Sequence, residues 1–239
     1  MTTKKFVLPQ LYFSKLMRAI TEFELIEEGD KILLGISGGK DSIFMAYAMA
    51  MMQKRPEKEI FKLQALTINP MFSEDFDTEC IRGFMEELGI PFASFHVDIA
   101  GTIENQGGKD PCYTCAFFRR GAVNRYAKEQ GCNKVAYAHH HDDAVETFFM
   151  GLLYSGSFIP YSQDLFGQNG FDGYSSLGVL PRSGNTRGNS VSCFEPVPSP
   201  CPYDGHTIRQ KVKDLIQEIS QDNPQLYSHL AAAMRQGCH

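Results

Sequence analysis

The residues Ser37-Gly-Gly-Lys-Asp-Ser42 have the composition of a phosphate-binding loop and lie between a short apolar run and a helical pattern. Adjacent glycines allow the backbone to approach a ligand closely, and a helix N-terminus offers N–H groups and partial positive charge to a phosphate. Lys40 adds a charge, and Asp41 suits a magnesium ion beside the phosphate. The loop is not a Walker A motif, because Gly39-Lys40 is followed by Asp41 instead of Ser or Thr. The alternative interpretation is a plain glycine turn between a strand and a helix.

A second polar motif, His139-His-His-Asp142-Asp143, also separates a strand pattern from a helical pattern. Consecutive side chains point in different directions, and metal ligands on a helix usually stand at i and i+4, so we do not expect a zinc site here. Either aspartate is suited to the positive end of the following helix. That capping role is compatible with a second role beside a bound phosphate.

Three of the seven cysteines have the setting of metal or redox ligands. Cys112 and Cys115 form a Cys-x-x-Cys pair ahead of the helical pattern over 115–130, and Cys201 lies between two prolines. The pair alone fits a redox couple, half of a zinc site or two ligands of an iron–sulfur cluster. Three cysteines without a fourth suit either a cluster with one open iron or a Cys3His zinc site. The other cysteines have no paired spacing: Cys80, Cys132, Cys193 and Cys238.

Hydrophobic patterning predicts the elements that position these residues. Short buried strands alternate with amphipathic helices, which is typical of an α/β fold: a Rossmann-like parallel sheet with helices on both faces. The expected strands are 31–36, 63–68, 92–97, 134–138 and 176–180. The expected helices are 9–27, 40–53, 74–88, 115–130, one from Asp142, one over 208–219 and one over 226–234. We expect a single domain over 1–239: an N-terminal helical segment 1–28, a core 29–180, an irregular loop 181–205 and C-terminal helices 206–239.

Composition narrows the class of protein. The net charge is −5, the pI is about 5.8, and no apolar run reaches the roughly 20 residues of a membrane helix. The sequence shows no signal peptide, and its odd number of cysteines argues against a disulfide framework, so we expect a cytoplasmic protein. The acidic total excludes a broadly basic RNA-coating protein. Residues 105–140, however, hold six Lys or Arg against two Asp or Glu, and residues 180–213 hold five against two.

The glycine loop resembles the pyrophosphate-binding loop of the N-type ATP pyrophosphatases, whose PP-loop fold is adenine nucleotide alpha hydrolase-like. The histidine motif resembles the His-His-x-Asp-Asp element of that family. Residues 22–42 and Cys112–Val123, together with these motifs, resemble the tRNA 2-thiocytidine synthetase branch, and the matching elements span nearly the whole chain. The resemblance implies ATP contacts from the following residues: Ser37, Gly38, Gly39, Lys40, Asp41, Ser42, Thr67, His139 and Asp142.

The same resemblance implies a 4Fe–4S cluster held by Cys112, Cys115 and Cys201, with ATP and Mg2+ as the other cofactors. Asp41 and the three cysteines would be the catalytic residues: ATP would adenylate the C2 oxygen of a tRNA cytidine, and sulfur from the open iron would displace AMP. The implied partners are tRNA and a sulfur donor, either a cysteine desulfurase or free sulfide, with a homodimer left open. Arg119 and Arg120 are candidates for RNA backbone contacts or for an ordinary solvated helix face.

The same residues also fit other functions. A related PP-loop enzyme could act on a tRNA uridine or on a small molecule, and a nucleotide-binding module could hold a structural zinc ion instead of the cluster. The chain also departs from the branch between residues 180 and 201, where relatives carry a further strand and helix and this chain has a loop rich in Pro, Gly, Ser and Asn. This departure puts the fifth strand and part of the tRNA-facing surface in doubt and leaves Cys193 as an alternative third ligand.

Overall fold

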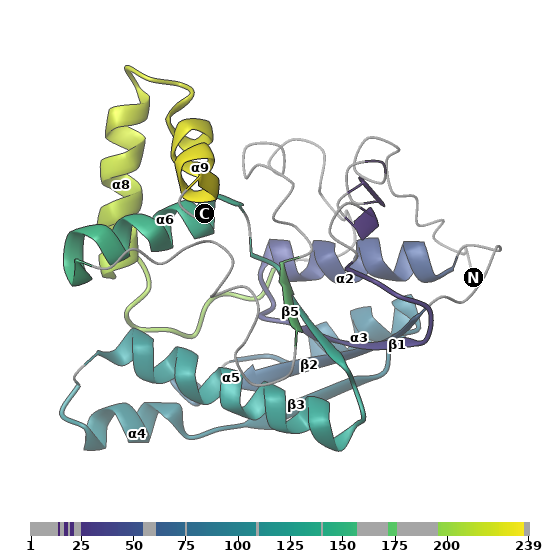
Figure 1. Cartoon of the computed structure of the whole chain (residues 1–239). Coiled ribbons are helices and arrows are strands. Elements are labelled where there is room, and N and C mark those ends of the chain that lie inside the picture. The colour runs from purple at the N-terminus through teal and green to yellow at the C-terminus, as the bar shows by residue number, and fades with distance from the viewer. Residues whose placement is uncertain are drawn as a thin grey trace.

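A computed structural model of the chain describes residues 14, 17–18, 20–21, 25–54, 61–74, 76–108, 110–139, 141–156, 172–175 and 196–236. Its centre is a five-stranded, fully parallel sheet with the strand order β3-β2-β1-β4-β5 (Figure 1). The strands are β1 Asp30–Gly35, β2 Phe61–Asn69, β3 Phe92–His96, β4 Lys134–Tyr137 and β5 Asp172–Ser175. The predicted α/β fold with a parallel sheet is confirmed.

Helices cover both faces of this sheet. The helices are α2 Lys40–Gln53, α3 Glu79–Leu88, α4 Ile99–Asn105, α5 Pro111–Glu129, α6 His141–Met150, the π-helix η1 Gly151–Ser155, α8 Ile208–Ser220 and α9 Leu226–Gln236. Side chains alternate across a strand, so Ile32 and Leu34 of β1 pack with α2 and α3, whereas Leu33 packs with Val123 and Ala127 of α5. The sheet is therefore a buried layer between two sets of helices, as its continuous apolar strands predict.

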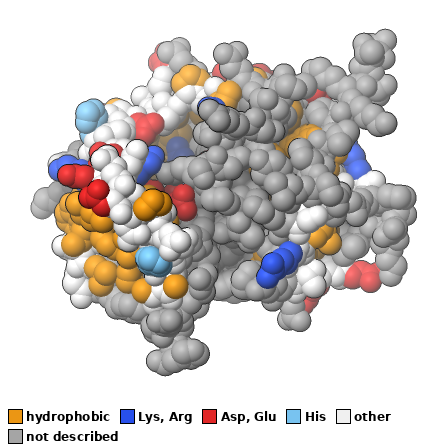
Figure 2. All heavy atoms as spheres, turned by 90° about the horizontal axis from the view of Figure 1, so that it is seen from above, with side chains coloured by type: hydrophobic (Ala, Val, Ile, Leu, Met, Phe, Trp, Pro, Cys, Tyr) orange, Lys and Arg blue, Asp and Glu red, His pale blue; other side chains and the backbone are white. Residues whose placement is uncertain are grey.

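A third apolar cluster lies beside this three-layer core. Val145 and Phe148 of α6 pack against Val212 and Ile216 of α8, with Leu226 and its neighbours from α9 around them. Figure 1 shows these three helices together at one end of the molecule, and Figure 2 shows hydrophobic side chains gathered at the same end. The C-terminal helices thus have their own small core, which attaches them to α6. Within the described part of the chain, no helix is both long and apolar enough to cross a bilayer.

Several predicted boundaries were wrong. Helix α5 begins at Pro111 instead of residue 115, because proline is favoured in the first turn of a helix, and both Cys112 and Cys115 therefore lie inside the helix near its N-terminus. Helix α3 begins at Glu79 instead of residue 74, and residues 25–27 are not helical, although the predicted N-terminal helix extended to 27. The predicted strand 176–180 lies outside the described residues; the fifth strand is 172–175.

Helix α4 was not predicted from the sequence. Its N-cap is Asp98, whose carboxylate accepts a hydrogen bond from Gly101 N–H at 2.8 Å, and Ile99 and Ile103 form its buried face. An aspartate followed by apolar residues four apart is a helix signal, but at seven residues the pattern is too short to stand out from a loop.

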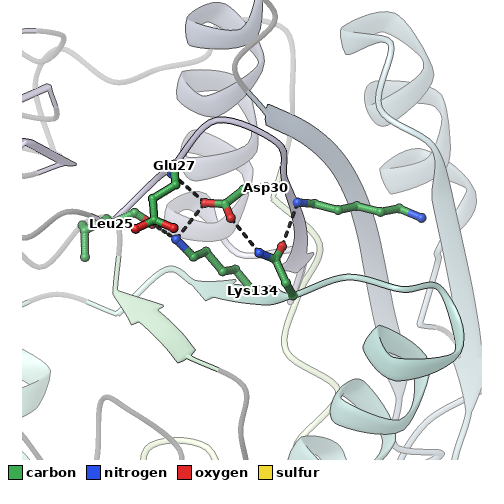
Figure 3. A network of polar contacts seen from close by, with 6 residues as sticks. Leu25, Glu27, Asp30 and Lys134 are labelled. Atoms are coloured by element: carbon green, nitrogen blue, oxygen red, sulfur yellow. Dashed lines mark hydrogen bonds and ion pairs between the residues drawn. The ribbon is translucent and has the colours of Figure 1, made fainter.

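A buried ion pair joins β1 to β4 at their amino ends (Figure 3). Lys134 Nζ lies 2.7 Å from Asp30 Oδ2, with both side chains less than a tenth exposed, and it also donates to the Leu25 carbonyl oxygen at 3.2 Å. Asn133 Nδ2 donates to Asp30 Oδ1 at 2.6 Å, and Glu27 N–H donates to Asp30 Oδ2 at 2.7 Å. Burial alone would raise the pKa of Asp30, but these hydrogen bonds and the charge of Lys134 outweigh it and hold that pKa below its usual value.

We predict that Lys134→Met lowers the free energy of unfolding by about 3–5 kcal/mol near neutral pH, because it leaves a buried carboxylate without its cation. A carboxylate with a depressed folded-state pKa stabilises the fold above its unfolded-state pKa of about 4, and this contribution is lost as the pH falls through the folded-state value. The difference between wild type and variant should therefore shrink in acid. Urea unfolding at several pH values measures it.

The matched control is the exposed pair Arg82–Glu79, with 3.2 Å between Arg82 Nε and Glu79 Oε1 and side chains 37% and 73% exposed. Glu79→Gln should cost less than about 1 kcal/mol because water screens this pair. Equal losses in the two variants, or a Lys134→Met effect that does not change with pH, would contradict the role given to the buried pair.

Candidate active site at the carboxyl edge of the sheet

The polar motifs converge on one edge of the sheet because of its topology. The glycine loop follows β1 and the histidine motif follows β4, and these two strands are hydrogen-bonded neighbours. The chain runs outward from β1 through β2 to β3 and then returns to β4 on the other side, so the strand order reverses between β1 and β4. Ligands of open parallel sheets bind at this kind of reversal, outside the carboxyl ends of the strands.

The glycine loop is held in shape by its own serines. The Ser42 hydroxyl donates to the Gly39 carbonyl oxygen at 2.9 Å and accepts from Ser37 N–H at 3.2 Å and from the Ser37 hydroxyl at 3.1 Å. Ser42 is buried, whereas Ser37 and Lys40 are exposed. Gly39 is the extended N-cap of α2 and makes no side-chain capping bond. Ser42 therefore shapes the loop, and Ser37, Lys40 and the start of α2 are its accessible groups.

A later segment of the chain lies directly on this loop. Val197 N–H donates to the Gly38 carbonyl oxygen at 3.1 Å. Gly38 has a φ of +81°, and a Cβ atom built there would stand 3.2 Å from the Val197 Cβ and 3.2 Å from the Ile81 Cδ1. Both the backbone conformation and the close contact require glycine. The segment that begins at residue 196 is thus fixed against the loop.

Cys201 follows four residues after this contact. Its carbonyl oxygen accepts from Asp204 N–H at 3.2 Å in a tight turn, and its own N–H donates to the Ser199 hydroxyl at 3.4 Å. The Tyr203 ring packs edge-on against Phe72, which follows β2, with 6.3 Å between the ring centres. The third cysteine is therefore held above the ends of β1 and β2 before the chain enters α8.

The structure brings the three candidate cysteines into electrostatic range of one another. Cys112 and Cys115 lie near the N-terminus of α5, which runs antiparallel to β4 and so begins at the carboxyl edge of the sheet. Burial raises the pKa of the Cys112 thiol and Cys201 raises it further, while Arg209 opposes the rise. Burial also raises the pKa of Cys115; Arg119 opposes this rise, and Cys201 and Cys112 add to it. The thiols thus form one group, with Arg209 near Cys112 and Arg119 near Cys115.

Arg209 joins this group to the histidine motif. From the first turn of α8, its Nη1 donates to the Asp143 carbonyl oxygen at 3.2 Å and its Nη2 donates to Thr147 Oγ1 at 2.9 Å. Nη1 also lies 3.5 Å from Oε2 of the buried Glu146. One guanidinium therefore fixes α8 to α6 and stands close enough to influence the Cys112 thiol. Arg209 was not predicted from the sequence, because a single arginine at a helix start has no distinctive pattern.

The remaining candidates have different settings. His139 is exposed and lies 5.8 Å, between ring centres, from Tyr137; Asp142 is half-buried in the first turn of α6. Thr67 is fully buried, and its hydroxyl donates to the Ile36 carbonyl oxygen at 2.9 Å, which supports the start of the glycine loop. ATP contacts by these residues stay predictions.

The two arginines differ as well. Arg119 is half-buried on the side of α5 that carries the cysteines, and Arg120 is exposed. Burial raises the pKa of Tyr137 to about 12, and Arg120 partly opposes this rise, which places Arg120 near the carboxyl end of β4. Among the residues that the structure describes, no three His, Cys, Asp or Glu side chains are arranged to hold a single metal ion. Cys193 lies outside the described residues.

Comparison with known proteins decides the family. A model described as a PP-loop domain matches residues 12–160. The tRNA-cytidine(32) 2-sulfurtransferase of Ralstonia pickettii is 30% identical over 230 residues, which cover 93% of this chain and 71% of that protein. The corresponding protein of Syntrophotalea carbinolica is 31% identical over 222 residues, which cover 91% of this chain and 85% of that protein. This chain belongs to the tRNA-cytidine 2-sulfurtransferase family of PP-loop proteins.

Solved structures support the fold of this sulfurtransferase family member. The U34-tRNA thiolase NcsA of Methanococcus maripaludis, solved with its 4Fe–4S cluster, has a TM-score of 0.78 at 22% identity, over 95% of this chain and 77% of that one. The NH3-dependent NAD synthetase of Campylobacter jejuni has a TM-score of 0.51 at 16% identity, over 95% of this chain and 93% of that one. The resemblance to PP-loop tRNA thiolation enzymes is confirmed, as is the expectation of an ATP-using transferase.

We predict that Gly38→Ala weakens both the loop and its contact with Val197. The alanine would carry the roughly 1–2 kcal/mol cost of a left-handed backbone and would also meet two side-chain atoms at 3.2 Å. Gly131→Ala is the matched control, because Gly131 has a φ of +66° and open space at its Cβ position. We expect a larger fall in melting temperature and weaker ATP binding for Gly38→Ala only. ATP affinity equal to wild type in the Gly38 variant would contradict this account of the loop.

Proposed function

We propose that this protein is a tRNA sulfurtransferase that uses ATP to replace the C2 oxygen of a tRNA cytidine with sulfur, through a 4Fe–4S cluster held by Cys112, Cys115 and Cys201. The observation that supports it most is the position of Val197 on the glycine loop, which brings Cys201 close to the candidate ATP site. The named relatives act on a cytidine at position 32 of tRNA, which favours cytidine over uridine as the base.

The ATP half of the site needs groups that neutralise phosphate and position the α-phosphorus. Lys40 is exposed at the loop and supplies charge, and the start of α2 supplies N–H groups and the helix dipole. Asp41, in the first turn of α2, is a hard oxygen ligand suited to Mg2+ beside a phosphate. His139 and Asp142 approach the same edge from β4 and α6. Attack by the cytidine O2 on the α-phosphorus would form the adenylated base and release pyrophosphate.

The cysteine group fits an iron–sulfur cluster by its chemistry. Three thiols from two segments lie within electrostatic range of one another; burial raises the pKa of Cys112 and of Cys115, and Arg209 and Arg119, respectively, partly oppose these rises. Soft thiolates are the usual ligands of iron–sulfur clusters, and each binds a separate iron, so they need not converge on one point. When bound, a cluster with three protein ligands supplies an iron with an open position for the sulfur that is transferred.

The protein's own task is to present the activated base to that sulfur. The backbone bond between Val197 and Gly38 sets the distance between the ATP loop and the turn that carries Cys201. Arg209 fixes α8, which follows that turn, to α6, which carries the histidine motif. Both contacts hold the ATP loop and the cysteine group on one rigid edge of the sheet. The adenylated cytidine and the sulfur would then meet in a fixed geometry instead of by a bimolecular encounter.

We predict that changes in the ATP loop and in the cysteine group impair different steps of the reaction. Cys201→Ser should lower the iron and sulfide content and abolish thiolation of unmodified tRNA, while ATP binding remains. Asp41→Asn should keep the iron and sulfide but lower AMP and pyrophosphate formation by at least about a hundredfold, the scale of losing one electrostatic stabiliser. Both are measured after anaerobic purification and reconstitution.

Cys80→Ser is the matched control, because Cys80 is exposed and lies on α3. It should keep the metal content and activity of wild type. Stoichiometric zinc without iron or sulfide would overturn the sulfur-transfer mechanism and favour a module with structural zinc. Full activity and cluster content in Cys201→Ser would contradict its role as a ligand and turn attention to Cys193. ATP and RNA binding without any AMP formation would favour a binding module over an enzyme.

A further inference from the structure

Helix α5 carries exposed aromatic side chains that its packing does not require. Tyr113 is 72% exposed and Phe117 is 61% exposed, and their rings lie nearly parallel, with 6.3 Å between centres and 22° between planes. Phe118 stands edge-on to Phe117 at 5.6 Å. The buried residues of α5 are Thr114, Val123 and Ala127. The aromatic side chains are thus presented to solvent at the end of the helix that extends past the sheet.

Positive charge lies next to this aromatic group. Arg120 is one helical turn beyond Phe117 and two beyond Tyr113, so it continues the same face of α5. The whole helix carries Arg119, Arg120, Arg125 and Lys128 against the single acidic residue Glu129. Arg120 also lies near Tyr137 at the end of β4, which places this face beside the carboxyl edge of the sheet. The chain as a whole is acidic, so this basic and aromatic face is a local feature.

We infer that Tyr113 and Phe117, with Arg120, form a stacking platform for unpaired bases of the RNA substrate. Exposed aromatic rings bind single-stranded RNA because every base has a flat π-face, and a neighbouring arginine binds the phosphate between successive bases. A duplex keeps its bases stacked on one another, so this platform selects a loop. A folded protein partner would gain from the rings but would need acidic groups opposite the arginines, whereas RNA supplies negative charge at every nucleotide.

The geometry assigns the platform to bases beside the target. Tyr113 follows Cys112 directly, but successive residues of a helix point about 100° apart, and Phe117 lies nearly opposite Cys115 around the helix axis. A base stacked on Phe117 therefore cannot also face the cysteine group. The platform would hold a base next to the modified one, so that the modified base alone turns toward the cysteines. This inference rests on the proposed function, which identifies the RNA as tRNA. The aromatic surface itself is observed in the structure.

The test is RNA binding by the full chain, purified anaerobically, with two probes: a hairpin with an unpaired seven-nucleotide loop and a fully paired duplex of the same length. Fluorescence anisotropy gives the affinities, and 2-aminopurine placed in the loop reports stacking by quenching. Phe117→Ala should weaken hairpin binding by about tenfold, and the double substitution Tyr113→Ala/Phe117→Ala by more, because stacking on one aromatic ring contributes roughly 1–3 kcal/mol, or about five- to 150-fold. Phe117→Trp should restore both affinity and quenching.

Tyr154→Ala is the matched control, since Tyr154 is also an exposed aromatic, at 55%, and lies on η1 instead of α5. It should leave hairpin affinity unchanged. Iron and sulfide content is measured in each α5 variant, so that damage to the neighbouring cysteines is recognised. Hairpin affinity and quenching that do not change in the double variant would overturn the inference. The same follows if the variant changes only the oligomeric state, because the surface is then a protein interface.

Failure of the proposed function gives a different result. If the protein lacks iron or forms no thiolated nucleoside, but hairpin binding still depends on Phe117, the platform stands and the reaction is wrong. If thiolation proceeds and the aromatic variants bind and react as wild type, the reaction stands and the platform is wrong.

Discussion

The backbone contact between Val197 and Gly38 is the constraint on which the site depends. A Cβ atom at residue 38 would crowd Val197 and Ile81 at 3.2 Å, and only glycine accepts the left-handed φ there without strain. The contact ties together regions that are about 160 residues apart in sequence. It fixes where the chain goes before Cys201, and therefore how far the third thiol lies from the loop. Without it, the start of α5 would still present two cysteines, but the third would lose its direct link to the glycine loop.

The parallel sheet sets the rest of the arrangement. Helices that connect parallel strands run antiparallel to them, so α2, α5 and α6 all begin at the carboxyl edge, where their positive ends favour anionic ligands. The opposite edge is closed by the buried pair of Asp30 and Lys134, which locks β1 beside β4. Because these two strands carry the glycine loop and the histidine motif, a structural ion pair at one edge fixes the register of the functional groups at the other.

The sequence predicted the elements with strong local patterns and missed those that depend on distant contacts. Four of the five strands and the glycine loop were recognised because apolar runs and glycine pairs are local signals. The start of α5 was misplaced because a Cys-x-x-Cys after a proline looks like a turn, and Pro111 in fact begins the helix. Val197 and Arg209 could not be predicted from the sequence. A valine in a proline-rich loop and an arginine on a helix are common, and these two matter because of their contacts with Gly38 and with α6. The aromatic residues of α5 can be read from the sequence, but their exposure to solvent cannot.

We propose that one edge of the sheet couples ATP cleavage to sulfur transfer onto a tRNA cytidine. The direct measurement is a reaction of the anaerobically reconstituted protein with ATP, sulfide and unmodified tRNA, in which AMP and modified nucleosides are quantified together by mass spectrometry. We expect equal amounts of AMP and 2-thiocytidine, and neither product when ATP or tRNA is left out. Thiolated uridine in place of 2-thiocytidine would contradict the assigned base. AMP formed with no thiolated nucleoside, under conditions that preserve iron and sulfide, would contradict the coupling itself.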